Sequence, residues 1–463
     1  PDQLPSALLE ATRVLTSPAN TGAVTLALPQ DVQAESWDYP DGLFAKRVWH
    51  IARTMADRTL LARAIEWIRA AKKPFIITGG GVIYSEASES LASLVEQTGI
   101  PVGETMAGKG ALPWNHPQNL EAVGVTGTPG ANILAREADL VIAVGTRLSD
   151  FTTASKTAFQ NPYVRFININ IAEFDAHKQA ALPLVADARV TLDEFREALK
   201  GYRVADEYLS RIASYKEQWN TETECLFNRR HGPPISQSEV IGIVNQFSKP
   251  NDVVVCAAGS LPGDLHKLWR TRDPKGYHLE YGNSCMGYEI AGGLGVKIAD
   301  PTREVYLMVG DGSYLMMSSE IVTALQEGYK LTIVVLNNYG FSSIGGLSQA
   351  LGSGGFGTDY KLRRSESGQL DGPRLEVDFA ANAASLGAQV ERATTGEDLQ
   401  KALDVARRNK RTTVIVIEVD KEERVPGYES WWDVPVAEVS EMESVKRARE
   451  SYEKAVKRER FFS

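Results

Sequence analysis

Cysteine and long apolar runs are both scarce in this chain of 463 residues. Its three cysteines, Cys225, Cys256 and Cys285, show neither the CxxC nor the histidine-paired spacing of a zinc site. So few cysteines favour a reducing compartment, and we interpret them as small apolar core residues. No apolar run approaches the roughly 20 residues that span a bilayer, and no secretory signal is visible. The sequence therefore predicts a cytoplasmic protein without a membrane partner.

Basic residues are the minority among the charged ones. The 50 lysines and arginines face 59 aspartates and glutamates, which gives a formal net charge of −9. This balance argues against nucleic acid or an anionic membrane surface as a partner. Because 43% of the residues are hydrophobic, the chain has enough apolar surface for more than one core. We expect two or three domains.

A Gly-Asp-Gly motif at residues 310–312 and an Asn-Asn pair at 337–338 each follow an apolar run. Residues 305–309 and 331–336 read as buried strands, and residues 318–327 read as a helix between them. In such a βαβ unit the two strands are parallel, so their carboxyl ends meet at the edge where α/β sheets bind ligands.

The residue types at this edge suit a magnesium ion. Mg²⁺ prefers oxygen ligands and takes one or two from the protein, with phosphates and water supplying the others. Asp311 offers a carboxylate, Asn338 an amide oxygen, and Gly340 a backbone carbonyl in the following turn. This geometry suits a metal ion that bridges a diphosphate, and a neutral amide adds no negative charge beside the diphosphate. We therefore predict Asp311, Asn338 and Gly340 as metal ligands.

Two turns are predicted to hold the diphosphate itself. Gly310 and Gly312 remove side chains where the backbone must come close, and Ser313 offers a hydroxyl and N–H groups at a helix start. Gly259 and Ser260 follow another apolar strand, at 252–256, and their N–H groups have the same potential. An ordinary turn without a ligand remains the alternative at each place.

These motifs resemble the thiamine diphosphate signature, and residues 282–287 with 291–293 resemble the acetolactate synthase branch of that family. The resemblance covers nearly the whole chain and implies thiamine diphosphate and Mg²⁺ as cofactors. It places Met286 under the cofactor, where the side chain holds the two rings in a bent conformation. It also implies that the backbone carbonyl of Ser284 accepts the pyrimidine amino hydrogen, with Asn338 among the cofactor-binding residues.

The same resemblance implies an α/β fold with parallel-sheet, Rossmann-like domains and a truncated N-terminal pyrimidine domain. A helix at 4–15 leads into an apolar segment at 22–29 that reads as a buried strand without preceding partner strands. In the family the pyrimidine domain carries the glutamate that activates the cofactor. Glu35 and Glu104 lie in the wrong context, so we assign no catalytic residue. We expect that glutamate before Pro1, and expect these 463 residues alone to bind cofactor weakly without turnover.

The chain divides into five predicted parts. Their ranges are 1–43, the end of the pyrimidine-binding domain plus a linker; 44–202, a central Rossmann-like domain; 203–233, a linker; 234–425, the diphosphate-binding domain; and 426–463, a C-terminal tail.

Several further features have open interpretations. Residues 79–81 and 145–147 follow strands, and we favour structural turns over ligand loops for both. His116 lies in a predicted loop, where packing is favoured over substrate contact. The aromatic segment 427–433 could form a lid over a polyol ring or anchor the tail, and we favour the anchor. The glycine-rich run 345–357 is a better candidate for a lid than this aromatic segment.

Segments 313–317, 351–358 and 427–432 resemble one hydrolase of the branch, an enzyme of myo-inositol catabolism. This resemblance implies that the chain hydrolyses a carbon–carbon bond in a cyclic polyol 1,2-dione to give 5-deoxyglucuronate. It also implies a homodimer or homotetramer with the active site between subunits. Two alternatives remain open: a carboligase of the acetolactate synthase type, and a non-catalytic cofactor-binding subunit.

Overall fold

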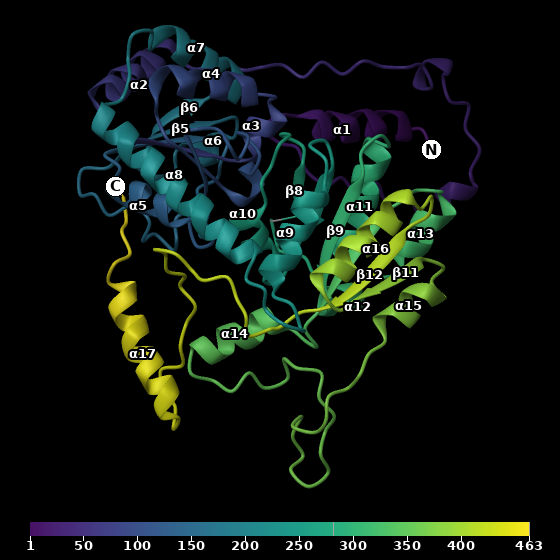
Figure 1. Cartoon of the computed structure of the whole chain (residues 1–463). Helices are drawn as coiled ribbons and strands as arrows, with labels where there is room; N and C mark the ends of the chain where they lie inside the picture. The colour runs from purple at the N-terminus through teal and green to yellow at the C-terminus, as the bar shows by residue number, and fades with distance from the viewer. Residues whose placement is uncertain (281, 463) are drawn as a thin grey trace.

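The computed structural model describes residues 1–280 and 282–462, and two six-stranded parallel sheets organise them (Figure 1). The first sheet, of the central domain, has the order β3-β2-β1-β4-β5-β6. The second, of the C-terminal domain, has the order β11-β12-β10-β9-β7-β8. The central strands are β1 Pro74–Thr78, β2 Val102–Glu104, β3 Asn119–Ala122, β4 Leu140–Val144, β5 Arg165–Asn170 and β6 Leu182–Val185. The C-terminal strands are β7 Val253–Cys256, β8 Tyr277–Leu279, β9 Val305–Gly310, β10 Thr332–Asn337, β11 Gln389–Ala393 and β12 Thr413–Glu418.

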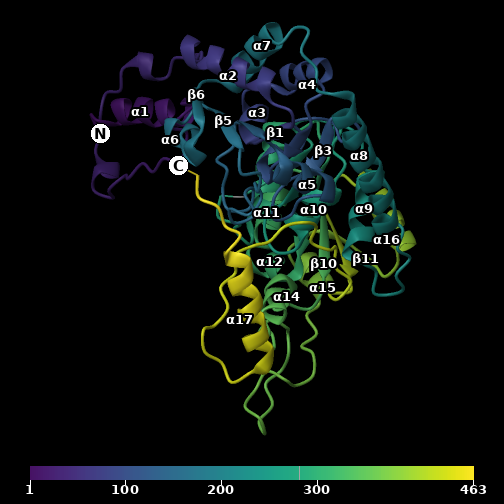
Figure 2. The same cartoon turned by 90° about the vertical axis from the view of Figure 1, so that its left-hand side faces the viewer.

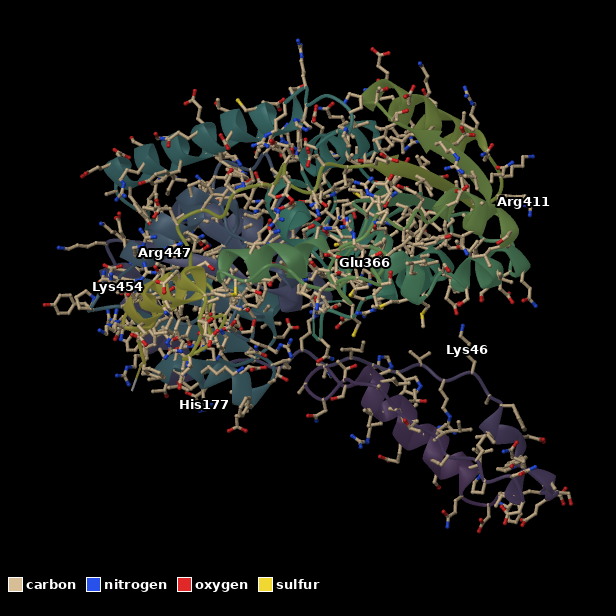
Figure 3. The ribbon with its side chains drawn as sticks, turned by 90° about the horizontal axis from the view of Figure 1, so that it is seen from below. Lys46, His177, Glu366, Arg411, Arg447 and Lys454 are labelled. Carbon is tan, nitrogen blue, oxygen red and sulfur yellow. The ribbon has the colours of Figure 1, made fainter. Side chains whose placement is uncertain are left out.

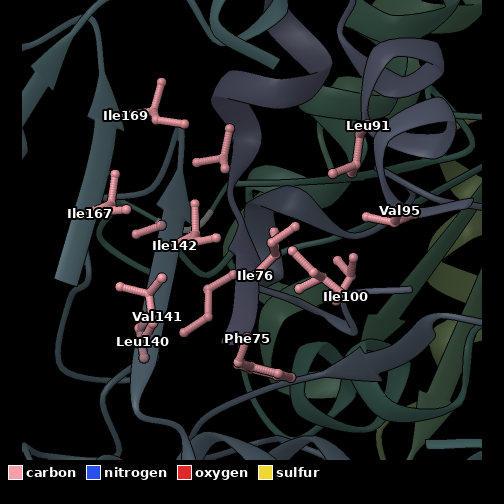
Figure 4. Packing of buried hydrophobic residues seen from close by; sticks show 14 of the residues in the cluster. Phe75, Ile76, Leu91, Val95, Ile100, Leu140, Val141, Ile142, Ile167 and Ile169 are labelled. Atoms are coloured by element: carbon pink, nitrogen blue, oxygen red, sulfur yellow. The ribbon is translucent and has the colours of Figure 1, made fainter. Parts of the chain in front are cut away.

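The central sheet is covered by helices whose apolar faces pack on it. Phe75 and Ile76 of β1 pack in one buried core with Leu91 and Val95 of α4 (Figure 4). Helix α4 ends at Gly99, whose left-handed backbone satisfies a carbonyl of the last turn. The helices and short 3₁₀ turns of this domain are α2 Arg58–Ala70, α3 Gly80–Tyr84, α4 Ser88–Thr98, η3 Met106–Gly108, α5 Pro129–Glu137, α6 Glu173–Ala176, η4 Lys178–Ala180 and α7 Ala188–Ala198.

The C-terminal sheet is buried on both faces, as a parallel sheet requires. Met308 of β9 belongs to one core and Leu307 to the other, because successive side chains point to opposite faces. A capping box joins Ser236 and Glu239 at the start of α9. The helices of this domain and its tail are α9 Gln237–Phe247, α10 Leu261–Leu268, α11 Tyr288–Ala299, α12 Asp311–Met316, α13 Glu320–Gln326, α14 Ser342–Ala350, α15 Phe379–Ser385, α16 Gly396–Arg408 and α17 Glu443–Val456.

Helix α8, Asp206–Phe227, connects the two domains and packs into both (Figure 1 and Figure 2). Tyr208 and Ile212 are part of the central core, whereas Trp219 and Phe227 are part of a C-terminal core. The predicted linker therefore contains a structural helix. Its two ends hold the domains in contact, which keeps the loops between them in a fixed arrangement.

The N-terminal residues contain one confirmed and one wrong prediction. Helix α1, Leu4–Thr16, forms where the sequence indicates it. Residues 22–29 form no strand, and Val24, Leu26 and Leu28 are 36%, 41% and 55% exposed. An extended segment without a neighbouring strand has nothing to accept its backbone hydrogen bonds, so apolar content alone does not make it a strand. Figure 3 shows this segment, η1 Val32–Ala34 and η2 Asp41–Leu43 in the purple part of the chain that carries Lys46. This part lies apart from the two domains.

Two smaller expectations, on a helix and on the cysteines, also need correction. The helix predicted at 318–327 is shorter, as α13, and a separate short helix, α12, begins directly at Asp311. The glycine-rich run 345–357 is partly helical, since Gly345 and Gly346 lie inside α14. Of the cysteines, Cys256 is buried as predicted, but Cys225 and Cys285 are exposed. Within the described ranges, no helix has both the length and the apolar character needed to cross a membrane.

Candidate active site

A cavity of about 670 Å³ lies where loops of the two domains and the tail meet. The strand ends of β7, β9 and β10 supply its C-terminal-domain wall, the loop after β4 supplies part of the central-domain wall, and the tail adds Trp432. The predicted site residues that line it are Gly259, Ser260, Ser284, Met286, Gly310, Asp311, Gly312, Ser313, Asn338 and Gly340.

The register of two neighbouring strands brings Asp311 close to the Asn-Asn turn. Leu336 of β10 pairs with Gly310 of β9, so both motifs leave the sheet at the same edge. The N–H of Gly340 donates to Oδ2 of Asp311 at 3.0 Å, and the N–H of Gly312 donates to Oδ1 at 2.9 Å. Burial raises the pKa of Asp311 to about 6, and these backbone N–H groups oppose the rise. The side chain of Asp311 is fully buried, and its two backbone hydrogen bonds fix the orientation of the carboxylate.

The residues fit a magnesium ion by their chemistry. The Oδ1 atom of Asn338 is buried and accepts no hydrogen bond within the described ranges. A buried amide oxygen without a donor is unfavourable unless another group, such as a cation, satisfies it. Among the described residues, no group of three or more His, Cys, Asp or Glu side chains is arranged for a metal. The candidate site thus has one carboxylate and neutral oxygens, which suits an ion that also binds phosphate.

The glycines at the predicted phosphate turns have different structural roles. A Cβ atom at Gly310 or Gly259 would meet no atom within 4 Å, so the backbone at both borders open cavity space. At Gly312 a Cβ would lie 2.8 Å from the ring of Phe341, so this glycine makes room for an aromatic side chain. The hydroxyl of Ser260 donates to Oε1 of Gln237 at 3.2 Å, which holds its turn.

Ser313 differs from its predicted use. Its hydroxyl lies 2.8 Å from both carboxylate oxygens of Glu289, and it accepts the N–H of Gly287 at 2.8 Å. The hydroxyl is therefore already engaged, and only the backbone at the start of α12 remains for a phosphate. Burial raises the pKa of the Glu289 carboxyl.

Glu289 is a site residue that the sequence reasoning missed. It lies in the first turn of α11 and accepts from the hydroxyl of Ser313, which in turn accepts the N–H of Gly287, while the N–H of Ala258 donates weakly to it from the end of β7 at 3.5 Å. One side chain thus connects three of the loops that border the cavity. The available signal was a lone carboxylate in a mostly apolar, glycine-rich helix.

The turn that carries Met286 is held by Glu280. Its carboxylate accepts the N–H groups of Asn283 and Cys285 at 2.9 and 2.8 Å. Ser284 between them has a left-handed backbone, with φ of 52°. The turn thereby presents Ser284 and Met286 to the cavity.

The remaining candidates separate into structural and cavity residues. A Cβ at Gly79 would lie 2.3 Å from the carbonyl oxygen of Gly145, so these two turns pack directly on each other. His116 is buried, and its Nδ1 accepts the N–H of Gln118, away from the cavity. Arg147, by contrast, lines the cavity.

The tail segment is anchored as predicted and also reaches the site. Asn132 donates to the carbonyl of Tyr428 at 2.8 Å, and Arg136 donates to that of Glu429 at 2.9 Å. Trp432, four residues beyond Tyr428, lines the cavity.

Two family models match the chain and define its class. The thiamine pyrophosphate enzyme central domain matches residues 61–195, and the C-terminal TPP binding domain of the same enzymes matches residues 257–417. Curated relatives named 3D-(3,5/4)-trihydroxycyclohexane-1,2-dione hydrolase occur in Bacillus thuringiensis (strain Al Hakam), Bacillus cereus (strain 03BB102) and Bacillus anthracis. Each is 47% identical over 475 residues, covering 97% of this chain and 74% of the relative. The chain belongs to this family of thiamine pyrophosphate enzymes.

Proposed function

We propose that this protein hydrolyses a carbon–carbon bond in 3D-(3,5/4)-trihydroxycyclohexane-1,2-dione, with thiamine diphosphate and Mg²⁺, to give 5-deoxyglucuronate in inositol catabolism. The observation that carries the proposal is the 47% identity to hydrolases of that name over 97% of the chain. The cavity at the strand ends, with Asp311, Asn338 and Gly340 along its wall, supports the same reading. When bound, thiamine diphosphate supplies an ylid that stabilises a carbanion.

We assign the metal to three oxygen ligands from this chain. Asp311 provides its carboxylate, Asn338 its unpartnered amide oxygen, and Gly340 its backbone carbonyl. The buried position of Asp311 and its two backbone hydrogen bonds support this assignment, because they keep the carboxylate in one orientation.

We assign the diphosphate and the rings to the loops around that ion. Backbone N–H groups of Gly259, Ser260 and Ser313 would bind phosphate oxygens, and Gly310 and Gly312 keep the backbone near the cavity. Met286 would support the two rings in their bent arrangement, and the carbonyl of Ser284 would accept the pyrimidine amino hydrogen.

The sequence also predicts the domain ranges, the oligomeric state and the location of the protein. We retain the predicted domain ranges, 1–43, 44–202, 203–233, 234–425 and 426–463; residue 463 lies outside the described residues. A homodimer or homotetramer with the active site between subunits, and a cytoplasmic location, remain predictions from the sequence.

Two measurements on the complete protein test this function. Calorimetry should detect uptake of thiamine diphosphate in Mg²⁺ but not in a chelator. Purified protein should then consume the cyclic dione with formation of 5-deoxyglucuronate and should not condense pyruvate. Pyruvate condensation would support a carboligase instead, and cofactor uptake without either reaction would support a binding subunit.

A further inference from the structure

The cavity has a wall that the proposed cofactor residues leave unused. It comes from the loop after β4 and from the tail, and its side chains combine two aromatic rings with charged and hydroxyl groups. Those side chains are Arg147, Ser149, Asp150, Phe151 and Trp432. They lie on the central-domain side, whereas the proposed metal and diphosphate residues belong to the C-terminal domain.

Two side-chain contacts hold Trp432 in this wall. Its indole Nε1–H donates to Oδ2 of Asp150 at 2.8 Å, and its ring lies 5.0 Å from that of Phe151, centroid to centroid. Hydrogen bonds also attach the residues on either side of Trp432 to the central domain. Ser430 donates to the carbonyl of Val125 at 2.9 Å, and the N–H of Asp433 donates to the hydroxyl of Ser155 at 2.8 Å. A side chain held this way presents the same face to every ligand, without ordering on binding.

Asp150 and Arg147, which line the same cavity, have polar atoms without a partner among the described residues. Oδ2 of Asp150 accepts from the indole, while its other oxygen accepts nothing from the residues that the structure describes. Arg147 is exposed at the cavity, and its guanidinium has no ion-pair partner in the described ranges. A carboxylate accepts from hydroxyl groups, and a guanidinium offers five donors in a planar fork. An aromatic face beside them covers the apolar C–H face of a saturated ring.

We propose that Trp432, Asp150 and Arg147 form a recognition subsite for the hydroxyl groups of an alicyclic polyol ring. The subsite sets the preference for a hydroxylated cyclic dione over an unsubstituted one. This inference rests on the proposed function and deepens it, because it names the residues that distinguish the substrate class. Trp432 packs on the ring, while Asp150 and Arg147 bind its oxygens.

The test compares two substrates on the complete protein loaded with thiamine diphosphate and Mg²⁺. One is the trihydroxylated dione, and the other is cyclohexane-1,2-dione, which lacks the hydroxyl groups. The variants are Trp432→Ala, Asp150→Asn and Arg147→Gln. Asp150→Asn and Arg147→Gln should each lower kcat/KM for the hydroxylated ring on the order of tenfold or more, because ring hydroxyl groups lose a binding partner, and should change the value for cyclohexane-1,2-dione by less than about twofold. Trp432→Ala removes the packing surface for both rings and the donor that orients Asp150, so it should lower kcat/KM for both substrates, and more for the hydroxylated ring. Equal losses for both substrates would overturn the subsite.

Trp431→Phe is the matched control, since this neighbouring tryptophan packs near Tyr452 and is not part of the cavity wall. It should leave the ratio of the two kcat/KM values unchanged. A loss of preference in Trp431→Phe as large as in Trp432→Ala would count against the proposal, because it would trace the effect to the tail as a whole.

A binding measurement separates this inference from the reaction. Ligand-detected NMR with myo-inositol as probe needs no turnover, and the three variants should weaken its binding on the order of tenfold. If the protein binds myo-inositol in this manner but converts no dione, the proposed reaction falls and the subsite stands. If the wild type and the variants bind myo-inositol alike, the subsite is refuted. Cofactor affinity should stay within about twofold in all variants, because none of these residues is assigned to the cofactor.

Discussion

The hydroxyl of Ser313 donates to the carboxylate of Glu289, with both carboxylate oxygens 2.8 Å away. This contact joins α12, which begins in the Gly-Asp-Gly motif, to the start of α11. The same hydroxyl accepts the N–H of Gly287, so it fixes the turn that follows Met286. The contact thus sets the relative position of two loops that border the cavity.

Removal of this hydroxyl should weaken both the fold and the cofactor site. In Ser313→Ala, Glu289 loses its hydroxyl donor and the N–H of Gly287 loses its acceptor, so the free energy of unfolding should fall by about 1–3 kcal/mol. Thiamine diphosphate affinity should fall as well. Urea denaturation and calorimetry measure the two effects. Ser319→Ala is the control, because Ser319 is exposed and makes no side-chain cap hydrogen bond. A stability as high as that of the control would contradict the prediction.

The metal assignment predicts that Asp311→Asn loses Mg²⁺-dependent cofactor binding. We expect the affinity for thiamine diphosphate in Mg²⁺ to fall at least about tenfold, because the carboxylate is the charged ligand at this site. Asn338→Ala should reduce it less, since it removes a neutral ligand. In a chelator, all three proteins should bind equally weakly. Calorimetry that finds the same Mg²⁺ dependence in Asp311→Asn and the wild type would refute the assignment.

Two glycines of α11 should respond to alanine in opposite directions. A Cβ at Gly293 would lie 1.9 Å from Cδ2 of Leu307, so Gly293→Ala overpacks the core and should lower the free energy of unfolding by about 1–3 kcal/mol. Gly295 has no atom within 4 Å of a Cβ, so Gly295→Ala should raise it by about 0.5–1 kcal/mol through the helix backbone. The denaturation midpoints of the two variants should lie on either side of the wild type. A Gly293→Ala midpoint at or above the wild type would show that the helix can move away.

Glu104 should make stability depend on pH. Burial raises its pKa from 4.5 to about 7, and the N–H groups of Gly110 and Leu112 bind its Oε1. The charged groups that face it are Lys109 and Glu121. Between these two pH values the folded protein holds a proton that the unfolded chain releases, so stability falls as pH rises from about 4.5 to about 7. The full change is about 3 kcal/mol at most.

Glu104→Gln tests that pH dependence with little change of shape. The amide oxygen can accept the same two backbone N–H groups, and the variant does not titrate. Denaturation midpoints of the wild type should fall from pH 5 to pH 7.5 relative to those of the variant. Parallel curves for the two proteins would assign the pH dependence to other groups.

Much of the fold follows from apolar runs in the sequence, with failures that have a physical cause. The strands β4, β9, β10 and β12 are recognisable because both of their faces are buried, which makes them continuously apolar. Strands β2 and β3 have three and four residues and include Glu104 and Asn119, so no pattern marks them. Residues 22–29 have strand composition and yet form no strand, because pairing depends on a neighbour.

The sequence by itself predicted the chemistry of the candidate metal site. Asp311 and Asn338 stand directly after apolar runs, and adjacent parallel strands deliver such residues to one edge. Only the tertiary structure decided the partners of Ser313 and the place of Trp432, which is 282 residues from Asp150 in the chain. Strand spacing is a local property that a sequence displays, whereas contacts between distant loops depend on how whole domains pack. Glu289 and Trp432 therefore became visible as site residues only in the folded chain.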